Sequence, residues 1–195
     1  MKTGLILPVG ARDHIQGANQ ASVTLVEYGD YECPHCGAAY PTVRALQREL
    51  GTKLRFVYRN FPIRELHPHA QAAAEAAEAA GAQGKFWEMH DALFDDQQKL
   101  GWNTLLQRAM DLRLDLARWE RDMRGRFFSE RVQEDFLSGL RSGVNGTPTF
   151  FINDCRYDGR FDAEPLLLAL EASVANGANG TNSAQPPTGL ATRAR

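Results

Sequence analysis

The chain has 195 residues, of which 43% are hydrophobic and 24% are charged, and its formal net charge is -2. A chain of this length and hydrophobic content can bury the core of one domain, with room for an insertion, and needs no disulfide or metal ion to fold. The small net charge gives no electrostatic basis for binding nucleic acid or an anionic membrane, and three cysteines are too few for a secreted disulfide framework.

The amino-terminal segment, residues 1–21, predicts an irregular lead-in rather than a leader peptide. Its apolar stretch at residues 5–7 is followed by Pro8, Arg12 and Asp13 before a signal-peptide core of ordinary length can form. No run in the chain approaches the length needed to cross a bilayer. We therefore expect a cytoplasmic protein that does not insert into a membrane.

A pair of cysteines lies between a predicted strand and a predicted helix. Residues 23–28 are β-branched and apolar and end at Gly29, as expected for a buried strand that meets a turn. Apolar residues at helical spacing predict a helix over residues 40–50, with Gly51 as its stop. The motif Cys33-Pro34-His35-Cys36 falls between these two elements, where the helix is expected to begin.

This position favours a reactive thiolate at Cys33. The first N–H groups of a helix lack intrahelical partners and the helix dipole favours negative charge there. A free cysteine has a pKa of about 8.5 and reacts as the thiolate, so such stabilisation makes it a nucleophile near neutral pH. His35 adds positive charge when protonated, and Pro34 suits the first helical turn. Cys36, one turn further on, can approach Cys33 and resolve a mixed disulfide.

The same cysteine spacing also occurs as half of a structural zinc site. The other half is missing here, because the third cysteine, Cys155, stands alone, although His67 and His69 could supply ligands. Redox chemistry is favoured because the motif adjoins a strand–helix unit. We expect no metal and no cofactor, since the dithiol of Cys33 and Cys36 is itself the redox group.

The next part of the chain predicts a second strand and a helical block. Residues 53–59 alternate as a strand does. From residue 67 to residue 143 the pattern is helical throughout, with Asp115 as a candidate N-cap. The predicted helices cover residues 67–81, 86–94, 105–110, 116–123 and 132–140.

The last part predicts a hairpin, a closing helix and a tail. Residues 146–152 and 155–157 form the expected hairpin, and residues 165–174 the expected helix. Residues 177–195 lack periodicity and predict a disordered tail. The expected division is thus a core from residues 22–62 and 144–176, and an inserted helical domain from residues 63–143.

The Cys-Pro-His-Cys motif, the helical insertion and the later Thr147-Pro148 resemble the DsbA-like family of thiol–disulfide oxidoreductases, over residues 22–174. The resemblance implies an α/β, thioredoxin-like fold with an inserted helical domain. It also implies an enzyme that exchanges disulfides with protein or peptide thiol and disulfide substrates, together with an unidentified redox partner. Cys33 would then be the exposed attacking thiol and Cys36 the buried resolving thiol.

The resemblance assigns further roles near the dithiol. Pro148 matches the proline that follows a cis peptide bond and leaves the preceding backbone free to pair with a substrate peptide. Thr147 would face the Cys33 sulfur and tune its thiolate, unless it is an ordinary edge-strand threonine. Pro34 and His35, between the cysteines, would set the oxidising strength.

Glu27 lies six positions before Cys33, where the family often carries a buried acid. A buried carboxyl would have a raised pKa and could exchange protons with Cys36. The alternative is a glutamate at the end of a strand, exposed to water. Cys155 is expected to be a bystander, and His67 and His69 to cap or flank a helix.

Two other functions remain open at this point. Glutathione-using isomerases or transferases have related folds, but they do not require a second cysteine such as Cys36. A non-enzymatic zinc-binding or chaperone-like adaptor is the other alternative. A cytoplasmic location conflicts with a role as an oxidant, because cytosolic thiols are kept reduced. A missing leader or a different physiological role would resolve this conflict.

Overall fold

The computed structural model describes residues 4–180, and of residues 176–180 only the backbone. A five-stranded mixed sheet has the order β1-β3-β2-β4-β5. Its strands are β1 (His14–Gly17), β2 (Val23–Gly29), β3 (Leu54–Asn60), β4 (Thr149–Ile152) and β5 (Cys155–Tyr157). The helices are α1 (Pro34–Leu50), α2 (Ala70–Gly81), α3 (Phe86–Asp95), α4 (Trp102–Asp111), α5 (Leu116–Arg124), α6 (Ser129–Arg141) and α7 (Ala163–Gly180).

The sheet is built around two parallel strands. β2 and β3 pair in parallel, with α1 as the crossover between them, whereas β1, β4 and β5 join antiparallel. Together with the helices this is the thioredoxin-like α/β fold expected from the sequence. β2 is buried along its whole length, which explains why residues 23–28 read as a continuous apolar run rather than an alternating one.

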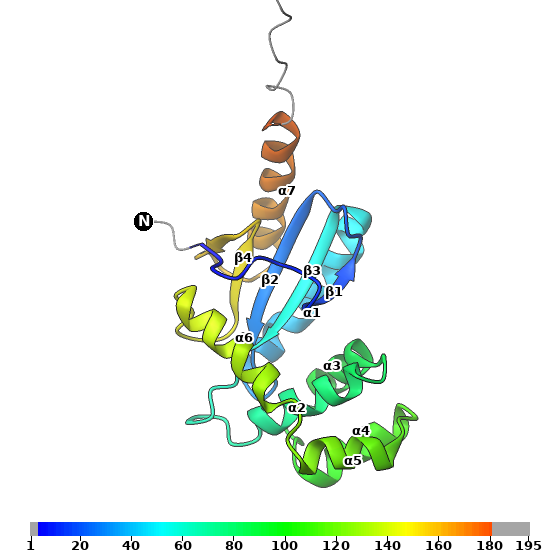
Figure 1. Cartoon of the computed structure of the whole chain (residues 1–195). Helices are drawn as coiled ribbons and strands as arrows, with labels where there is room; N and C mark the ends of the chain where they lie inside the picture. The colour runs from blue at the N-terminus through cyan, green and yellow to red at the C-terminus, as the bar shows by residue number, and fades with distance from the viewer. Residues whose placement is uncertain (1–3, 181–195) are drawn as a thin grey trace, which may run out of the picture.

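Helices cover both faces of the sheet (Figure 1). On one face, α1 and α7 pack on Leu25, Phe56 and Phe150 in the larger hydrophobic core. On the other face, α6 and the amino-terminal segment cover a smaller core that includes Val26, Val57 and Phe151. The sheet therefore forms the middle of three layers.

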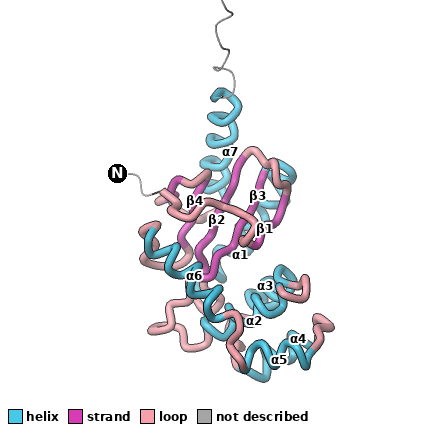
Figure 2. The backbone as a smooth tube through the Cα atoms, in the orientation of Figure 1, coloured by secondary structure: helices cyan, strands magenta, loops and turns pink. Residues whose placement is uncertain are grey.

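Helices α2 to α5 lie beyond one end of the sheet (Figure 2). Small alanine side chains let α2 pack closely against α3, α5 and α6. Asp115 is the N-cap of α5 and accepts a hydrogen bond from the N–H of Arg118 at 3.0 Å, as its position in the sequence predicts. Trp119 is completely buried in this part of the core.

The structure departs from the expected organisation at both ends of the chain. β1 lies in the segment expected to be irregular. Ile15 is the only apolar residue of β1, so the strand shows no alternation of apolar and polar residues. β1 forms because the edge of β3 offers unpaired backbone groups. α7 continues to Gly180, into the segment expected to be disordered, although Asn176 and Gly177 are residues that commonly end a helix. Residues 181–195 of that predicted tail lie outside the described residues.

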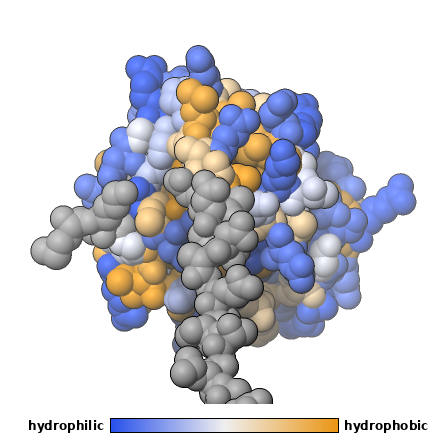
Figure 3. Space-filling view, turned by 90° about the horizontal axis from the view of Figure 1, so that it is seen from above, coloured by the Kyte–Doolittle hydropathy of each residue, from blue (hydrophilic) through white to orange (hydrophobic). Residues whose placement is uncertain are grey.

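The hairpin turn lies at Asn153 and Asp154, whose φ angles are 46° and 67°, and β4 begins at Thr149 rather than at residue 146. Seen from above, hydrophilic residues surround a smaller group of hydrophobic ones (Figure 3). Within residues 4–180, no helix is both long enough and apolar enough to cross a membrane.

Candidate functional site: a dithiol at the start of α1

The two cysteines lie at the junction of β2 and α1. Cys33 is the N-cap residue of α1 and Pro34 is its first helical residue, as the motif predicts. The N–H of Cys33 donates to the carbonyl oxygen of Asp30 at 3.2 Å, which closes the turn between strand and helix. Both thiols are free in the structure.

Cys33 is less accessible than expected. Its exposed fraction is 4%, against 0% for Cys36, so the expectation of an exposed attacking thiol is wrong for this state. The cover comes from the loop before β4, because the Cys33 thiol donates a hydrogen bond to the carbonyl oxygen of Thr147 at 3.3 Å. A substrate has to meet the sulfur along this loop.

The surroundings of Cys33 favour its thiolate. A hydrogen bond from the Cys36 thiol, another from the Thr147 side chain and the backbone N–H groups of Cys36 and His35 lower the pKa of Cys33 to about 5, against the opposing effect of burial. The N–H groups are those that a helix leaves unpaired at its first turn. At neutral pH this favours the Cys33 thiolate over the protonated thiol, and only the thiol can donate to the Thr147 carbonyl oxygen.

Cys36 is held in the opposite state. Burial, the hydrogen bond to Cys33 and the charges of Glu27 and Cys33 raise the pKa of Cys36 well above its ordinary value. The N–H of Asp30, whose distance from Cys36 Sγ is 3.4 Å, acts in the other direction. The pair thus consists of an ionised sulfur and a protonated sulfur, as nucleophilic attack followed by resolution requires.

Pro34 and His35 are both exposed. The contribution of His35 to the low pKa of Cys33 comes through its backbone N–H. An additional effect of the imidazole charge stays a prediction.

Thr147 and Pro148 lie in the loop that faces Cys33, and their peptide bond is cis. The Thr147 hydroxyl oxygen is buried and has no partner other than the Cys33 sulfur among the described residues. A hydrogen bond from this hydroxyl to the sulfur lowers the pKa of Cys33. Thr147 precedes β4, so the alternative of an ordinary edge-strand threonine is wrong.

Glu27 is buried beneath the dithiol. Its exposed fraction is 3%, so the alternative of a strand-end glutamate in water is wrong. Burial and the charge of Cys33 raise the pKa of Glu27 to about 8. A carboxyl group with this pKa can give or take a proton near neutral pH.

Two histidines hold the turn that precedes Cys33, which sequence reasoning missed. Nδ1 of His67 lies 2.8 Å from Oδ2 of the fully buried Asp30, and Nδ1 of His69 lies 2.8 Å from Oε1 of Glu32. The only signal in the sequence is that each histidine follows its acid by the same interval of 37 residues. His69 also precedes α2, as expected of a residue that flanks a helix.

The zinc-site alternative and the place of Cys155 can be compared with the structure. Within residues 4–180, no three His, Cys, Asp or Glu side chains are grouped so as to hold a metal ion. Cys155 is exposed on β5, where it pairs with Ile152, and it does not join the dithiol.

Comparisons with known proteins identify the family of the chain. The family described as Thioredoxin matches residues 11–172. The Na(+)/H(+) antiporter NhaA 1 of Salinispora arenicola is 47% identical over 172 residues, which cover 88% of this chain and 26% of that protein. The Na(+)/H(+) antiporter NhaA of Herminiimonas arsenicoxydans is 39% identical, over 90% of this chain and 27% of that protein. The chain thus spans about a quarter of the length of these curated relatives.

Solved structures share the fold over most of the chain. A thioredoxin-like oxidoreductase from Silicibacter pomeroyi is 29% identical, with a TM-score of 0.74 over 87% of this chain and 94% of that one. BdbD from Bacillus subtilis is 20% identical, with a TM-score of 0.78 over 89% of this chain and 97% of that one. The chain belongs to the thioredoxin family, and it shares the fold of these solved structures.

Proposed function

We propose that the chain exchanges disulfides with protein or peptide substrates through Cys33 and Cys36. One observation carries the proposal: the low pKa of Cys33, about 5, stands beside a resolving thiol whose pKa is raised. Stabilising the Cys33 thiolate stabilises the reduced form, and a stable reduced form makes the disulfide a strong oxidant. Neither a glutathione transferase nor a zinc adaptor needs this difference between two neighbouring thiols.

The oxidation of a substrate dithiol follows from this arrangement. A substrate thiolate attacks Cys33 Sγ of the enzyme disulfide, the Cys33–Cys36 bond breaks, and Cys36 leaves and takes up a proton. The second substrate thiolate then attacks the first substrate sulfur, and Cys33 leaves as a thiolate. The substrate loses two electrons, and the enzyme disulfide gains them.

Thr147 and Pro148 are the proposed substrate-binding residues. They form the loop that covers Cys33, and the carbonyl oxygen of Thr147 already accepts a hydrogen bond from the Cys33 thiol. Once Cys33 is in a disulfide, that carbonyl group is free to pair with an extended peptide. Glu27 is the proposed proton carrier for Cys36, and Pro34 and His35 are proposed to tune the redox potential.

The test is an insulin reduction assay with single variants. Cys33→Ser is expected to abolish exchange, and Cys36→Ala to accumulate mixed disulfides with the substrate. Titration of Cys33 alkylation against pH, with equilibration in glutathione buffers, gives its pKa and the redox potential. Full activity in the Cys33→Ser variant would show the proposal to be wrong.

A cytoplasmic location and the absence of a cofactor stay predictions. Fractionation of cells, with alkylation of thiols before lysis, would show where the protein is and whether its dithiol is reduced there.

The curated relatives are antiporters, and this chain matches only a part of each. That the chain acts in association with such a transporter is therefore a separate proposal. Its check is co-purification of the chain with a transporter from membranes.

A further inference from the structure

Asp30 contacts both cysteines through its main chain. Its carbonyl oxygen accepts the N–H of Cys33 at 3.2 Å, and its own N–H donates to Cys36 Sγ, which lies 3.4 Å away. Asp30 is 1% exposed, so water does not compete for these contacts. The position of this one residue therefore affects how both thiols are held at the start of α1.

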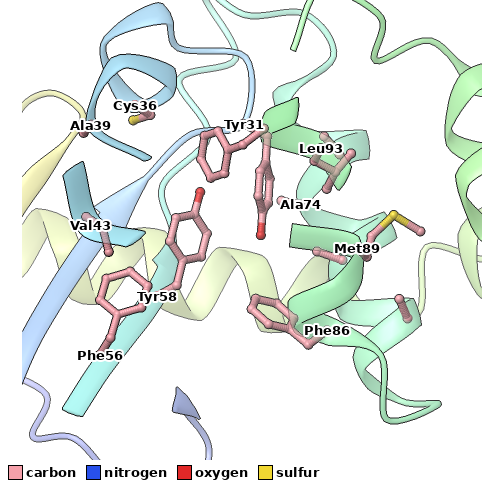
Figure 4. Close-up of a cluster of buried hydrophobic side chains, with 14 of the residues drawn as sticks. Tyr31, Cys36, Ala39, Val43, Phe56, Tyr58, Ala74, Phe86, Met89 and Leu93 are labelled. Atoms are coloured by element: carbon pink, nitrogen blue, oxygen red, sulfur yellow. The ribbon is translucent and has the colours of Figure 1, made fainter. Parts of the chain in front are cut away.

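The Cys36 sulfur has to carry negative charge in a place that water does not reach. Cys36 is completely buried, and Figure 4 shows it beside Ala39 of α1, at one side of the buried hydrophobic cluster. In the proposed exchange this sulfur is a thiolate when it leaves the enzyme disulfide and when it resolves a mixed disulfide. A buried anion is costly unless a hydrogen-bond donor stabilises it. The main-chain donor at this sulfur is the N–H of Asp30.

The side chain of Asp30 is fixed by three donors. Its Oδ1 accepts the N–H of Glu32 at 2.8 Å. Its Oδ2 accepts the N–H of Ile63 at 2.8 Å and lies 2.8 Å from Nδ1 of His67. Because a carboxylate has only acceptor atoms, Nδ1 of His67 is the donor of this third hydrogen bond. Together the three donors hold the buried carboxylate in one place.

Two of these donors come from the segment between β3 and α2, residues 61–69. The N–H of His67 donates to the carbonyl oxygen of Ile63 at 2.9 Å, so the segment closes on itself and presents both donors to Asp30. The N–H groups of Glu32 and Ile63 belong to the main chain and are present with any residue except proline. The imidazole of His67 is thus the donor that depends on the residue type.

We propose that the main-chain N–H of Asp30 stabilises the Cys36 thiolate during exchange, and that His67 is the positioning residue that holds this N–H in place. The inference rests on the proposed dithiol exchange. When a mixed disulfide is resolved, the Cys36 proton passes to Glu27 and the Cys36 thiolate attacks Cys33 Sγ. The Cys33–Cys36 bond forms, the bond from Cys33 to the substrate breaks, and the substrate sulfur leaves with the bonding pair as a thiolate. In the reverse step, Cys36 leaves as the thiolate beside the same N–H.

Other groups beside Cys36 act against its ionisation. The charges of Glu27 and Cys33 raise the pKa of Cys36, whereas the N–H of Asp30 lowers it. His67 acts on this sulfur through Asp30, so loss of the imidazole is expected to weaken the one favourable contact and leave the opposing charges in place. The titratable groups that face Cys36 are Cys33 from its own helix, Asp30 from the turn, Glu27 from β2 and Tyr58 from β3.

The test compares His67→Leu, which removes the donor, with His67→Asn, whose side-chain amide places an N–H at the position of Nδ1. All proteins carry Cys155→Ser, because Cys155 is an exposed free thiol. Reduced protein is mixed with an excess of an aromatic disulfide that releases a coloured thiolate. Attack by Cys33 releases the first equivalent in a step that depends on the reagent concentration. Attack by Cys36 on the resulting mixed disulfide releases the second equivalent in a step that does not.

In His67→Leu we expect the second step to slow about threefold at pH 7 and the first step to change much less. Loss of a hydrogen bond to a charged group raises the pKa of Cys36 by about one pH unit, so about tenfold less of it is ionised. The more basic thiolate is about threefold more nucleophilic, which offsets part of this loss. His67→Asn is expected to restore the second step.

The matched controls are His69→Leu and His69→Asn. Nδ1 of His69 lies 2.8 Å from Oε1 of Glu32, and the hydrogen bonds of Glu32 within residues 4–180 are with Asp30 and His69 rather than with a sulfur. Both steps should therefore change little in these two variants. A wild-type second step in His67→Leu, equal slowing of both steps, no recovery in His67→Asn, or the same slowing in His69→Leu would overturn the inference. Failure of the proposed function is distinct, because protein with an intact His67 would then release no second equivalent.

A second measurement covers the case in which His67→Leu does not fold. In the protein with Cys33→Ala and Cys155→Ser, Cys36 is titrated by NMR through the shift of its Cβ carbon. We expect the amide nitrogen of Asp30 to move with that titration, and the amide nitrogen of Glu32 to move much less. An Asp30 amide that does not follow the ionisation of Cys36 would overturn the inference and leave the exchange itself standing.

Discussion

The side-chain amide of Gln97, in the segment between α3 and α4, donates a hydrogen bond to the backbone carbonyl of Cys33 at 3.0 Å. The same amide nitrogen donates to the carbonyl of Tyr31 at 2.8 Å. This contact depends on Gly37 in the first turns of α1, because a Cβ atom there would lie 1.8 Å from Oε1 of Gln97. The inserted helices therefore reach back to the dithiol through a side chain that α1 admits only at a glycine.

The effect of Gly37→Ala on the free energy of unfolding is expected to depend on the residue at position 97. In the wild-type background the new methyl group displaces Gln97 and its two hydrogen bonds, which offsets the gain of about 1 kcal/mol from alanine in a helix. In the Gln97→Ala background the space is free, so Gly37→Ala should stabilise the protein by that amount. Urea unfolding of the wild type, the two single variants and the double variant measures the coupling energy between positions 37 and 97. Equal effects of Gly37→Ala in both backgrounds would mean that the two residues do not interact.

The two histidine–carboxylate pairs before Cys33 are expected to differ strongly in energy. His67→Ala leaves Asp30, which is fully buried, without its histidine partner, and we expect a loss of about 3 kcal/mol in the free energy of unfolding. His69→Ala is the control, because the His69 side chain is 51% exposed, and its pair with Glu32 should contribute at most about 1 kcal/mol. Urea unfolding at pH 6 and pH 8 compares them. Similar losses in both variants would contradict this ranking.

Local signals explain what could be predicted from the sequence. Helical periodicity and β-branched runs locate most elements within a few residues, and the motif at Cys33 and Cys36 locates the dithiol. For Glu27 the strand pattern left a buried and a water-exposed position open, and the structure shows the buried one. These features depend on residues that are close together in the sequence.

Features that depend on distant residues were missed. β1 has no pattern of its own and exists because β3 offers an edge. Two close contacts each need a glycine on another element: Gln97 with the dithiol turn, and Tyr58 over Gly29. A glycine in the sequence does not by itself indicate which side chain approaches it. The covering of Cys33 depends on the loop at Thr147, which no spacing near residue 33 predicts.

His35 is expected to tune the redox potential through two separate groups. His35→Ala removes the imidazole and keeps the backbone N–H that stabilises the Cys33 thiolate, whereas His35→Pro removes both. We expect His35→Pro to be the weaker oxidant of the two, with the higher pKa at Cys33. Equilibration with glutathione and pH titration of alkylation measure both quantities. If both variants keep the wild-type potential, residue 35 has no part in the tuning.

Glu27 is expected to make stability depend on pH in the direction opposite to Cys33. The pKa of Glu27 is raised from 4.5 to about 8 in the folded protein, so the folded state holds the proton more tightly. Its favourable contribution is complete below pH 4.5 and is lost as the pH rises through 8. The pKa of Cys33 is lowered from 9.0 to about 5, so its contribution is complete above pH 9.0 and is lost as the pH falls through 5.

The Glu27→Gln variant separates these two effects. Glutamine at this position does not titrate, and Cys33 is present in both proteins, so its effect largely cancels when wild type and variant are compared at one pH. The stability of the variant relative to wild type should therefore rise steadily from pH 4.5 to pH 8 and then level off. Urea unfolding of the fully reduced proteins at several pH values gives this difference. A difference that stays constant over the range would show that the Glu27 carboxyl titrates alike in the folded and unfolded states, and it would remove Glu27 as the proton carrier for Cys36.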